Sequence, residues 1–262
     1  MRLKGGQFIY YLASTIERLN VQASDEELGG VKDLYFDDQH WTIRYLVADT
    51  RKWLPGKKVL LSPIGFDHVD MNNSTVNVLA SKETVKNAPH KSNDEPVSKQ
   101  VEIDLATYYG WPTYWNGLGP WRGFDNPYAL ANAERDGLLD DNDVEKEYDF
   151  HLRSSNEIKG DVFGYSIEAE DGKIGHVSDF VVDDANWKIT YFVVETKNIL
   201  VGKFVLIATD WIKDINWDEK KVVVDLTKEQ VKQGADFNPN EPITRAYEDN
   251  LYSTFDKPKY WE

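Results

Sequence analysis

The chain has 262 residues, a net charge of −15 and no cysteine, and 41% of its residues are hydrophobic. This hydrophobic fraction is enough to build a buried core, so a wholly disordered chain is excluded. The missing cysteines exclude disulfides, thiolate catalysis and cysteine-ligated zinc, and the acidic charge disfavours nonspecific nucleic-acid binding and adsorption to an anionic membrane surface.

The N-terminal segment, residues 1–19, begins with basic residues and contains a short apolar run. Ser14, Thr15, Glu17 and Arg18 interrupt this run. It is therefore too short and too polar for a signal peptide or a membrane-spanning helix. We expect a cytoplasmic protein without membrane insertion.

A long stretch of the chain occurs twice, at a constant spacing of 146 residues, as from Val31 to Val177. It reads VKDLYFDDQHWTIRYLVADT at 31–50 and VSDFVVDDANWKITYFVVET at 177–196. Roughly a third of the positions are identical over the longer alignment, and a period of this length indicates duplicated domains rather than a solenoid. We predict a first unit over 1–116, a linker over 117–150 and a second unit over 151–262.

The repeated stretch has the pattern of a β-hairpin. Alternate residues are identical in the two copies, namely Trp41, Ile43, Tyr45 and Val47 in the first and Trp187, Ile189, Tyr191 and Val193 in the second. A period of two with one constant apolar face predicts a half-buried strand that begins at each tryptophan. The preceding acid pairs, Asp37-Asp38 and Asp183-Asp184, are typical of a turn. We therefore assign Asp37, Asp38, Trp41, Tyr45, Asp183, Asp184, Trp187 and Tyr191 to a structural hairpin and core.

Further strands are predicted on both sides of this hairpin. In the second copy they cover 164–170, 203–208, 211–217 and 222–226, and Asp171-Gly172 has the composition of a hairpin turn. Thr227 then begins a short helix, with Gln230 as its capping-box partner. About six short strands with frequent turns predict a mainly β fold of two small antiparallel barrels or sandwiches, each followed by a short helix.

The predicted linker changes character along its length. Its opening is rich in Gly, Pro and Asn, and Asn126 before Pro127 is a helix-start signal. Its end is acidic, with Asp140, Asp141, Asp143, Glu145, Glu147 and Asp149. We interpret this acidic run as a solvated segment rather than as a cation site.

Each copy ends in an aromatic tail, in which a Pro-x-Tyr-Trp group recurs at the same spacing. The tail residues with a possible contact role are Tyr108, Tyr109, Trp111, Tyr114, Trp115, Tyr260 and Trp261. One interpretation is that the tails pack onto the barrels and enlarge a small core. The other is that they contact a partner, because Tyr and Trp are enriched at interface hot spots.

No pattern of residues predicts catalysis, a metal site or a cofactor. The acid pairs could serve acid–base chemistry or bind calcium, but adjacent strand residues point to opposite faces and Asp is frequent in turns. The five histidines have neither zinc spacing nor histidine counterparts in the other copy. We find no phosphate loop and no nucleophile elbow, so we predict a protein that is not an enzyme.

This assignment predicts that metal ions do not stabilise the protein. Calcium or zinc is expected to leave the melting temperature nearly unchanged in a thermal-shift assay. A saturable rise at micromolar metal would contradict the prediction, since a ligand that binds only the native state must stabilise it.

The repeated motif resembles the PRC-barrel family. The resemblance lies in the I/L-G-x-V-x-D start, the D-D-x-x-W-x-I-x-Y hairpin and the G-K-x-V strand that follows, and it covers both copies. That family includes the cytoplasmic domain of the photosynthetic reaction-centre H subunit and the C-terminal domain of the ribosome maturation factor. The resemblance implies two PRC-type barrels and a role in binding or assembly, and it supplies no catalytic residue.

Three functions are therefore open. The first is a non-enzymatic protein-binding or assembly module whose partner is another protein or a second copy of the chain. The second is a small-molecule-binding protein or an enzyme with a site between the two barrels, which a polar cleft present in one copy only would favour. The third, implied by the resemblance, is a reaction-centre or ribosome-assembly role, although the net charge of −15 disfavours direct contact with nucleic acid.

Overall fold

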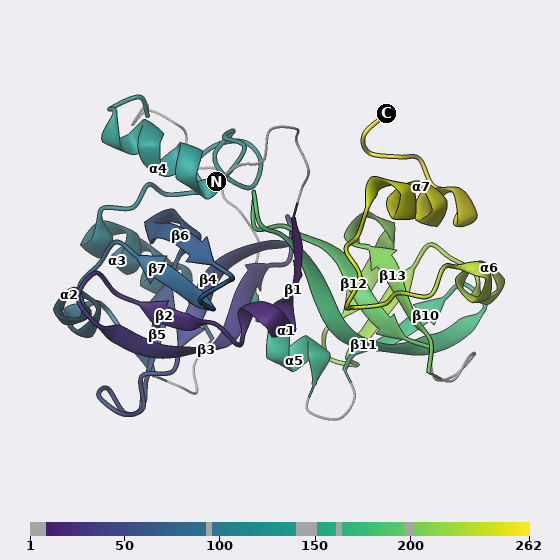
Figure 1. Ribbon diagram of the computed structural model, residues 1–262, viewed down its shortest axis with the longest axis horizontal. Helices are drawn as coiled ribbons and strands as arrows, with labels where there is room; N and C mark the ends of the chain where they lie inside the picture. Colours follow the sequence, from purple (N-terminus) through teal and green to yellow (C-terminus); the bar gives the residue numbers. More distant parts are fainter. Residues whose placement is uncertain (1–8, 93–95, 140–150, 161–163, 197–201) are drawn as a thin grey trace. The chain divides into compact units, whose positions relative to one another are not determined.

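The computed structural model describes residues 9–92, 96–139, 151–160, 164–196 and 202–262, and within them the fold is mainly β (Figure 1). These residues divide into two compact units. The repeat-1 unit contains 15–155 and 185–188, and the repeat-2 unit contains 1–14, 156–184 and 189–262.

The sheet of the repeat-1 unit runs in the order β6-β7-β2-β3-β4-β5-β8, with β9 paired to β3. Its strands are β2 (Asn20–Gln22), β3 (Glu27–Asp37), β4 (Thr42–Ala48), β5 (Lys57–Leu61), β6 (Phe66–Asp70), β7 (Thr75–Val78), β8 (Lys91–Ser92) and β9 (Leu152–Ser154). In the repeat-2 unit the order is β14-β15-β10-β11-β12-β13, with β1 paired to β11. Its strands are β1 (Tyr10–Leu12), β10 (Ser166–Ala169), β11 (Gly172–Asp183), β12 (Ile189–Glu195), β13 (Phe204–Ala208), β14 (Ile212–Asn216) and β15 (Lys221–Val224).

The two sheets share one strand order, which confirms the internal duplication. The repeat pattern predicted wholly antiparallel sheets, and this is wrong. Strand β2 pairs with β7 in parallel, and β10 pairs with β15 in parallel. Each parallel pair joins the first and last strands of a repeat. Since several strands intervene along the chain, no hairpin forces these two strands to run in opposite directions.

Helices follow and flank the sheets, and within the described residues none is long and apolar enough to cross a bilayer. They are α1 (Ala13–Ile16), α2 (Lys82–Asn87), α3 (Lys99–Tyr109), α4 (Pro127–Arg135), α5 (Ser155–Lys159), α6 (Lys228–Gln233) and α7 (Arg245–Thr254), with short 3-10 turns η1 (Pro63–Gly65) and η2 (Thr209–Trp211). Two predicted caps are confirmed: Asn126 caps α4, and Thr227 forms a capping box with Gln230 at α6.

The repeated hairpin differs in detail from its prediction. Trp41 and Trp187 do not begin the strands, because each adopts a left-handed backbone with φ of 55° and 63° and ends the preceding turn. Trp41 is half-buried, with its ring stacked on Phe36 at 5.4 Å. Trp187 belongs to the repeat-1 unit, where its ring packs edge-on against Phe66, so it does not share a strand face with Tyr191.

Strand β4 is buried along its whole length, whereas the alternating pattern predicted a half-buried strand. One face packs in a core cluster of Tyr35, Tyr45, Val47, Leu60 and Leu105. On the other face, the fully buried Trp121 covers Arg44 with 4.6 Å between guanidinium and ring centre. Residues 117–139, which were predicted to be linker, thus belong to the repeat-1 unit, and the acidic run at 140–149 lies outside the described residues.

Each sheet is completed by a strand from the segment that precedes the other copy. β9 pairs with β3 with Leu152 opposite Asp37, and β1 pairs with β11 with Tyr10 opposite Asp183. Asp37 and Asp183 are equivalent in the repeat, so the two added strands occupy equivalent places. The compact units therefore divide the chain differently from the predicted boundaries at 116 and 151.

Equivalent acids hold the two added strands. Ser154 donates a hydrogen bond of 2.6 Å to Asp33, and the backbone N–H of Ser14 donates one of 3.2 Å to its counterpart Asp179. The guanidinium of Arg153 also donates to Asp38 at 2.9 Å. These carboxylates therefore serve as strand anchors in the fold.

Candidate functional site

The aromatic tail of the first copy is fixed by a buried carboxylate. Glu102 on α3 accepts hydrogen bonds from the hydroxyl of Tyr45 on β4 and from that of Tyr114 in the tail. Burial raises the pKa of Glu102, although Lys99 and the two tyrosines oppose that rise. Burial, followed by the charge of Glu102, raises the pKa of both tyrosines well above 10, so they act as neutral donors.

The second copy repeats this arrangement. Glu248 on α7 accepts from Tyr191 of β12 at 2.6 Å and from Tyr260 of the tail at 3.1 Å. A cation covers the neighbouring indole in both copies, with Arg245 4.2 Å from the ring centre of Trp261. In the first copy Lys99 lies 3.4 Å from that of Trp115. One carboxylate thus joins tail, helix and sheet in each copy. This agrees with the interpretation that the tails pack onto the sheets and enlarge a small core.

Exposure separates the predicted contact residues. Tyr114 and Trp115 are interior, at 3% and 4% exposed, so they are unsuited to contact a partner. Tyr260 is 49% exposed and Tyr108 is 40% exposed. Of the others, Tyr109, Trp111 and Trp261 are half-buried.

A second buried cluster explains one of the predicted acid pairs. Arg44 and Asp37 are 1% and 0% exposed, and the Arg44 Nε donates to Asp37 Oδ2 at 2.8 Å. Asp37 also accepts the backbone N–H of Gln39 in the turn. Burial opposes ionisation of Asp37, but Arg44 and His40 outweigh it and hold its pKa below the ordinary value. This carboxylate is therefore a structural ion-pair partner.

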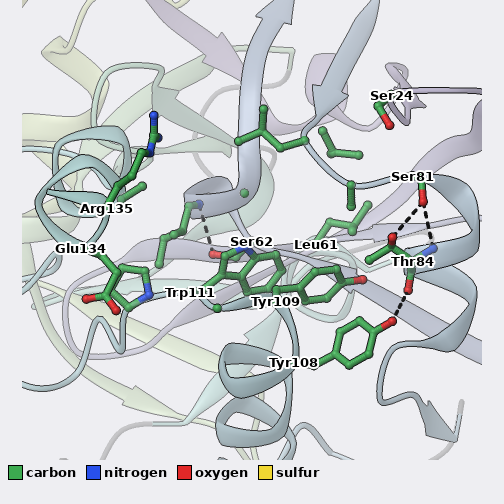
Figure 2. A pocket seen from close by; sticks show the side chains of 18 residues that line it. Ser24, Leu61, Ser62, Ser81, Thr84, Tyr108, Tyr109, Trp111, Glu134 and Arg135 are labelled. Carbon is green, nitrogen blue, oxygen red and sulfur yellow. Dashed lines mark hydrogen bonds between the residues drawn. The ribbon is translucent and has the colours of Figure 1, made fainter. Parts of the chain in front are cut away.

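A pocket of about 630 Å³ lies within the repeat-1 unit. Figure 2 shows its lining, in which three of the predicted contact residues, Tyr108, Tyr109 and Trp111, take part. The remaining lining residues are Ser24, Leu61, Ser62, Ile64, Gly65, Val78, Leu79, Ala80, Ser81, Thr84, Gly110, Pro112, Ala131, Glu134 and Arg135. Two chain segments, the tail of the first copy and α4, thus meet η1 and the start of α2 around one cavity.

The aromatic residues of the pocket form a row. Trp111 stacks on Tyr109 with 4.2 Å between ring centres, and Tyr108 meets Tyr109 edge-on at 5.1 Å. The hydroxyl of Tyr108 donates to the carbonyl of Thr84. Gly65 allows the indole its place, because a Cβ there would lie 2.8 Å from the ring of Trp111.

The second copy fills the equivalent place differently. Trp211 stands at the position of Gly65, and Lys257 stands at that of Trp111. The Trp211 ring is buried, 4.9 Å from the ring of Tyr252 and 5.3 Å from that of Phe255. The indole thus comes from the tail in the first copy and from η2 in the second.

The surface around Trp111 in the first copy also differs from the surface around Trp211 in the second. In the second, Asp225 pairs with Lys257 at 2.7 Å and with Lys213 at 2.8 Å. Hydrogen bonds from Lys213 and Lys257 lower the pKa of Asp225 to about 2. In the first copy the position of Asp225 is Leu79, which is 61% exposed. The second copy thus has an ion-paired surface at this place, whereas the first copy has an exposed leucine beside the pocket.

Exposed apolar side chains extend beyond the pocket. The large ones in the described part of the repeat-1 unit are Leu79, Tyr108, Leu118, Tyr128 and Leu138. Tyr128, which is 64% exposed, lies three and seven positions before Ala131 and Arg135 on α4, so it shares their helix face. Of the five, only Leu79 and Tyr108 line the pocket, and exposed apolar side chains of this kind mark interaction surfaces.

Several functional residues were missed by sequence reasoning. Glu102 and Glu248 occupy equivalent positions, so the repeat spacing alone could have identified them. The exchange of Gly65 for Trp211 was visible in the same alignment. Within the described residues no group of three or more His, Asp or Glu side chains is placed to hold a metal ion.

Comparison with known proteins agrees with this geometry. The family model described as PRC-barrel domain matches residues 8–85 and 160–231, which together form more than half of the chain. No curated protein matches the sequence. The two matched segments contain the strands that the two sheets share, β2 to β7 and β10 to β15. The chain belongs to the PRC-barrel domain family.

Proposed function

We propose that the protein is a non-enzymatic, cytoplasmic binding or assembly module made of two PRC-type barrels, and that it binds a protein partner through the pocket of the repeat-1 unit. The observation that carries this proposal is the difference between the copies. Where the second copy has an ion-paired surface, the first has Leu79, Trp111 and a cavity. An exposed leucine at the mouth of an aromatic pocket favours contact with another apolar surface.

The pocket lining supports binding rather than catalysis. None of its eighteen residues is a histidine. Ser62 and Ser81 are occupied as caps of η1 and α2, since each accepts a backbone N–H at the start of its helix. The two charged residues, Glu134 and Arg135, are exposed on α4. Such a set offers surface and shape but no nucleophile–base pair.

A small-molecule-binding function is the second candidate. The volume of about 630 Å³ falls in the range of known ligand pockets, roughly 300–1,000 Å³. The exposed Tyr128 on α4, outside the pocket lining, favours a protein instead, because a small ligand in the pocket would leave this side chain uncovered. The resemblance also implies reaction-centre or ribosomal assembly, and in the latter the charge of −15 favours a protein over RNA as the contact.

Substitution of Leu79 tests the proposal. Leu79→Asp places in the first copy the residue that the second copy carries, and the exposed position should tolerate it without loss of fold. Affinity capture from the native cell is expected to recover a partner with the wild type and to lose most of it with the variant. Leu118→Asp, the same change at a leucine outside the pocket lining, is the matched control and should retain the partner.

A stronger variant combines Gly65→Trp, Leu79→Asp and Trp111→Lys, which reproduces three residues of the second copy. It should fill the pocket and abolish capture, provided that its circular dichroism and melting curve match the wild type. Equal recovery of the partner by the wild type, the Leu79 variant and the folded triple variant would show that the pocket is not the binding site.

A further inference from the structure

The aromatic side chains of the pocket are suited to contact the flat, rigid rings of a bound segment. Figure 2 shows the rings of Trp111, Tyr109 and Tyr108 following one another along the pocket. Their consecutive contacts, at 4.2 and 5.1 Å, and the adjoining Pro112 make a continuous apolar track. Grooves lined by aromatic rings accept proline-rich segments in the polyproline II conformation.

The indole of Trp111 brings a free hydrogen-bond donor to this track. Its Nε1–H has no hydrogen-bond partner among the described residues, whereas Trp53 donates to Leu28 O at 2.8 Å and Trp121 to Asn186 O at 2.7 Å. An indole N–H in an apolar site usually finds an acceptor. A polyproline II segment supplies one, because it makes no internal hydrogen bonds and leaves its carbonyls free.

Other peptide conformations fit this pocket less well. An α-helix uses its carbonyls internally, so it would leave the indole N–H without an acceptor. An added β-strand needs an open sheet edge, and the edge strand that follows Gly65 is β6. Asp67 and His68 on β6 are exposed and charged or polar, which is how edge strands resist pairing.

Charge selects the flanks of such a segment. Glu134 and Arg135 are the charged residues of the pocket lining, and their opposite charges cancel, so the charge of the whole chain decides. The net charge of −15 favours basic over acidic approach. We propose that the pocket of the repeat-1 unit binds a proline-rich segment of the partner, in the polyproline II conformation and with basic flanking residues. This proposal rests on the proposed function.

Fluorescence anisotropy with labelled peptides tests this inference. The probes are an oligoproline core with a lysine at each end, the same core with glutamates, and an alanine-rich helical peptide with lysines, all at about 0.15 M ionic strength. The lysine-flanked oligoproline is expected to bind saturably and more tightly than the other two. Trp111→Phe replaces the indole by a smaller aromatic ring that has no N–H donor, and the loss of that hydrogen bond should weaken binding about fivefold.

Trp261→Phe, the same change in the tail of the second copy, is the matched control and should leave the affinity unchanged. The inference is wrong if the helical peptide binds as well as the oligoproline, or if Trp111→Phe has no effect. If no oligoproline binds but the captured partner is still lost in Leu79→Asp, the ligand class is wrong and the proposed function stands. If Leu79→Asp and the folded triple variant also leave capture unchanged, both fail.

Discussion

Replacing Arg44 by Ala is expected to lower the free energy of unfolding by about 3–5 kcal/mol, the range for breaking a buried ion pair from one side. The substitution leaves Asp37, which is 0% exposed, as a buried carboxylate without its guanidinium partner. It also removes the cation that lies 3.9 Å from the ring centre of Tyr114 and 4.6 Å from that of Trp121. Chemical denaturation of the purified variant measures the loss.

The pH dependence of this loss provides its control. The pKa of Asp37 lies below its unfolded value of about 3.9, so the ion pair stabilises the wild type fully above that value and less as pH falls through the folded pKa. Without Arg44, burial raises the pKa of Asp37 in the variant, so the difference between wild type and Arg44→Ala should be largest near neutral pH and shrink as the pH falls toward the folded pKa of the wild type. Arg44→Ala/Asp37→Asn, which removes both charges, should recover part of the loss. A loss under about 1 kcal/mol, as at surface positions, would contradict the buried assignment.

Deleting residues 1–12 is expected to weaken the repeat-2 unit rather than the repeat-1 unit. The deletion removes β1 from β11, and at about 1 kcal/mol for each of about three lost hydrogen bonds the cost is about 3 kcal/mol. It also removes Tyr10, whose hydroxyl donates to Glu248 at 3.0 Å and whose ring meets Tyr191 edge-on. Hydrogen exchange should show faster exchange in β11, with β3 unchanged.

Deleting residues 1–8 alone is the matched control, because it retains the whole of β1. The faster exchange in β11 should appear only when the deletion reaches residue 12. If exchange in β11 is the same in both deletions, β1 does not stabilise that sheet. If β3 rather than β11 is affected, the assignment of the N-terminal strand to the repeat-2 unit is wrong.

Local sequence signals predicted much of this fold correctly. The cap at Asn126, the capping box at Thr227 and the shared strand order all depend on residues close together in sequence or on the repeat itself. The reciprocal placement of β1 and β9 has no such signal. Each is only three residues long, and each pairs with a strand more than a hundred positions away.

The candidate site was predictable only in part. Tyr108, Tyr109 and Trp111 were identified because aromatic tails suit partner contact, but the same reasoning included Tyr114 and Trp115, which the structure buries. Composition cannot tell whether a tyrosine hydroxyl faces water or a buried carboxylate. That distinction depends on Glu102 and on the cover that residues 117–139 provide, and neither is visible in the tail itself.

We expect the partner to bind at the pocket of the repeat-1 unit. The most direct test is a two-dimensional ¹H–¹⁵N spectrum of the labelled protein, in which Trp111→Phe and Trp261→Phe assign two of the nine indole N–H signals. Addition of the captured partner is expected to shift the Trp111 signal and to leave the Trp261 signal in place. A shift of Trp261 with no change at Trp111 would contradict the claim and would place the partner on the tail of the second copy.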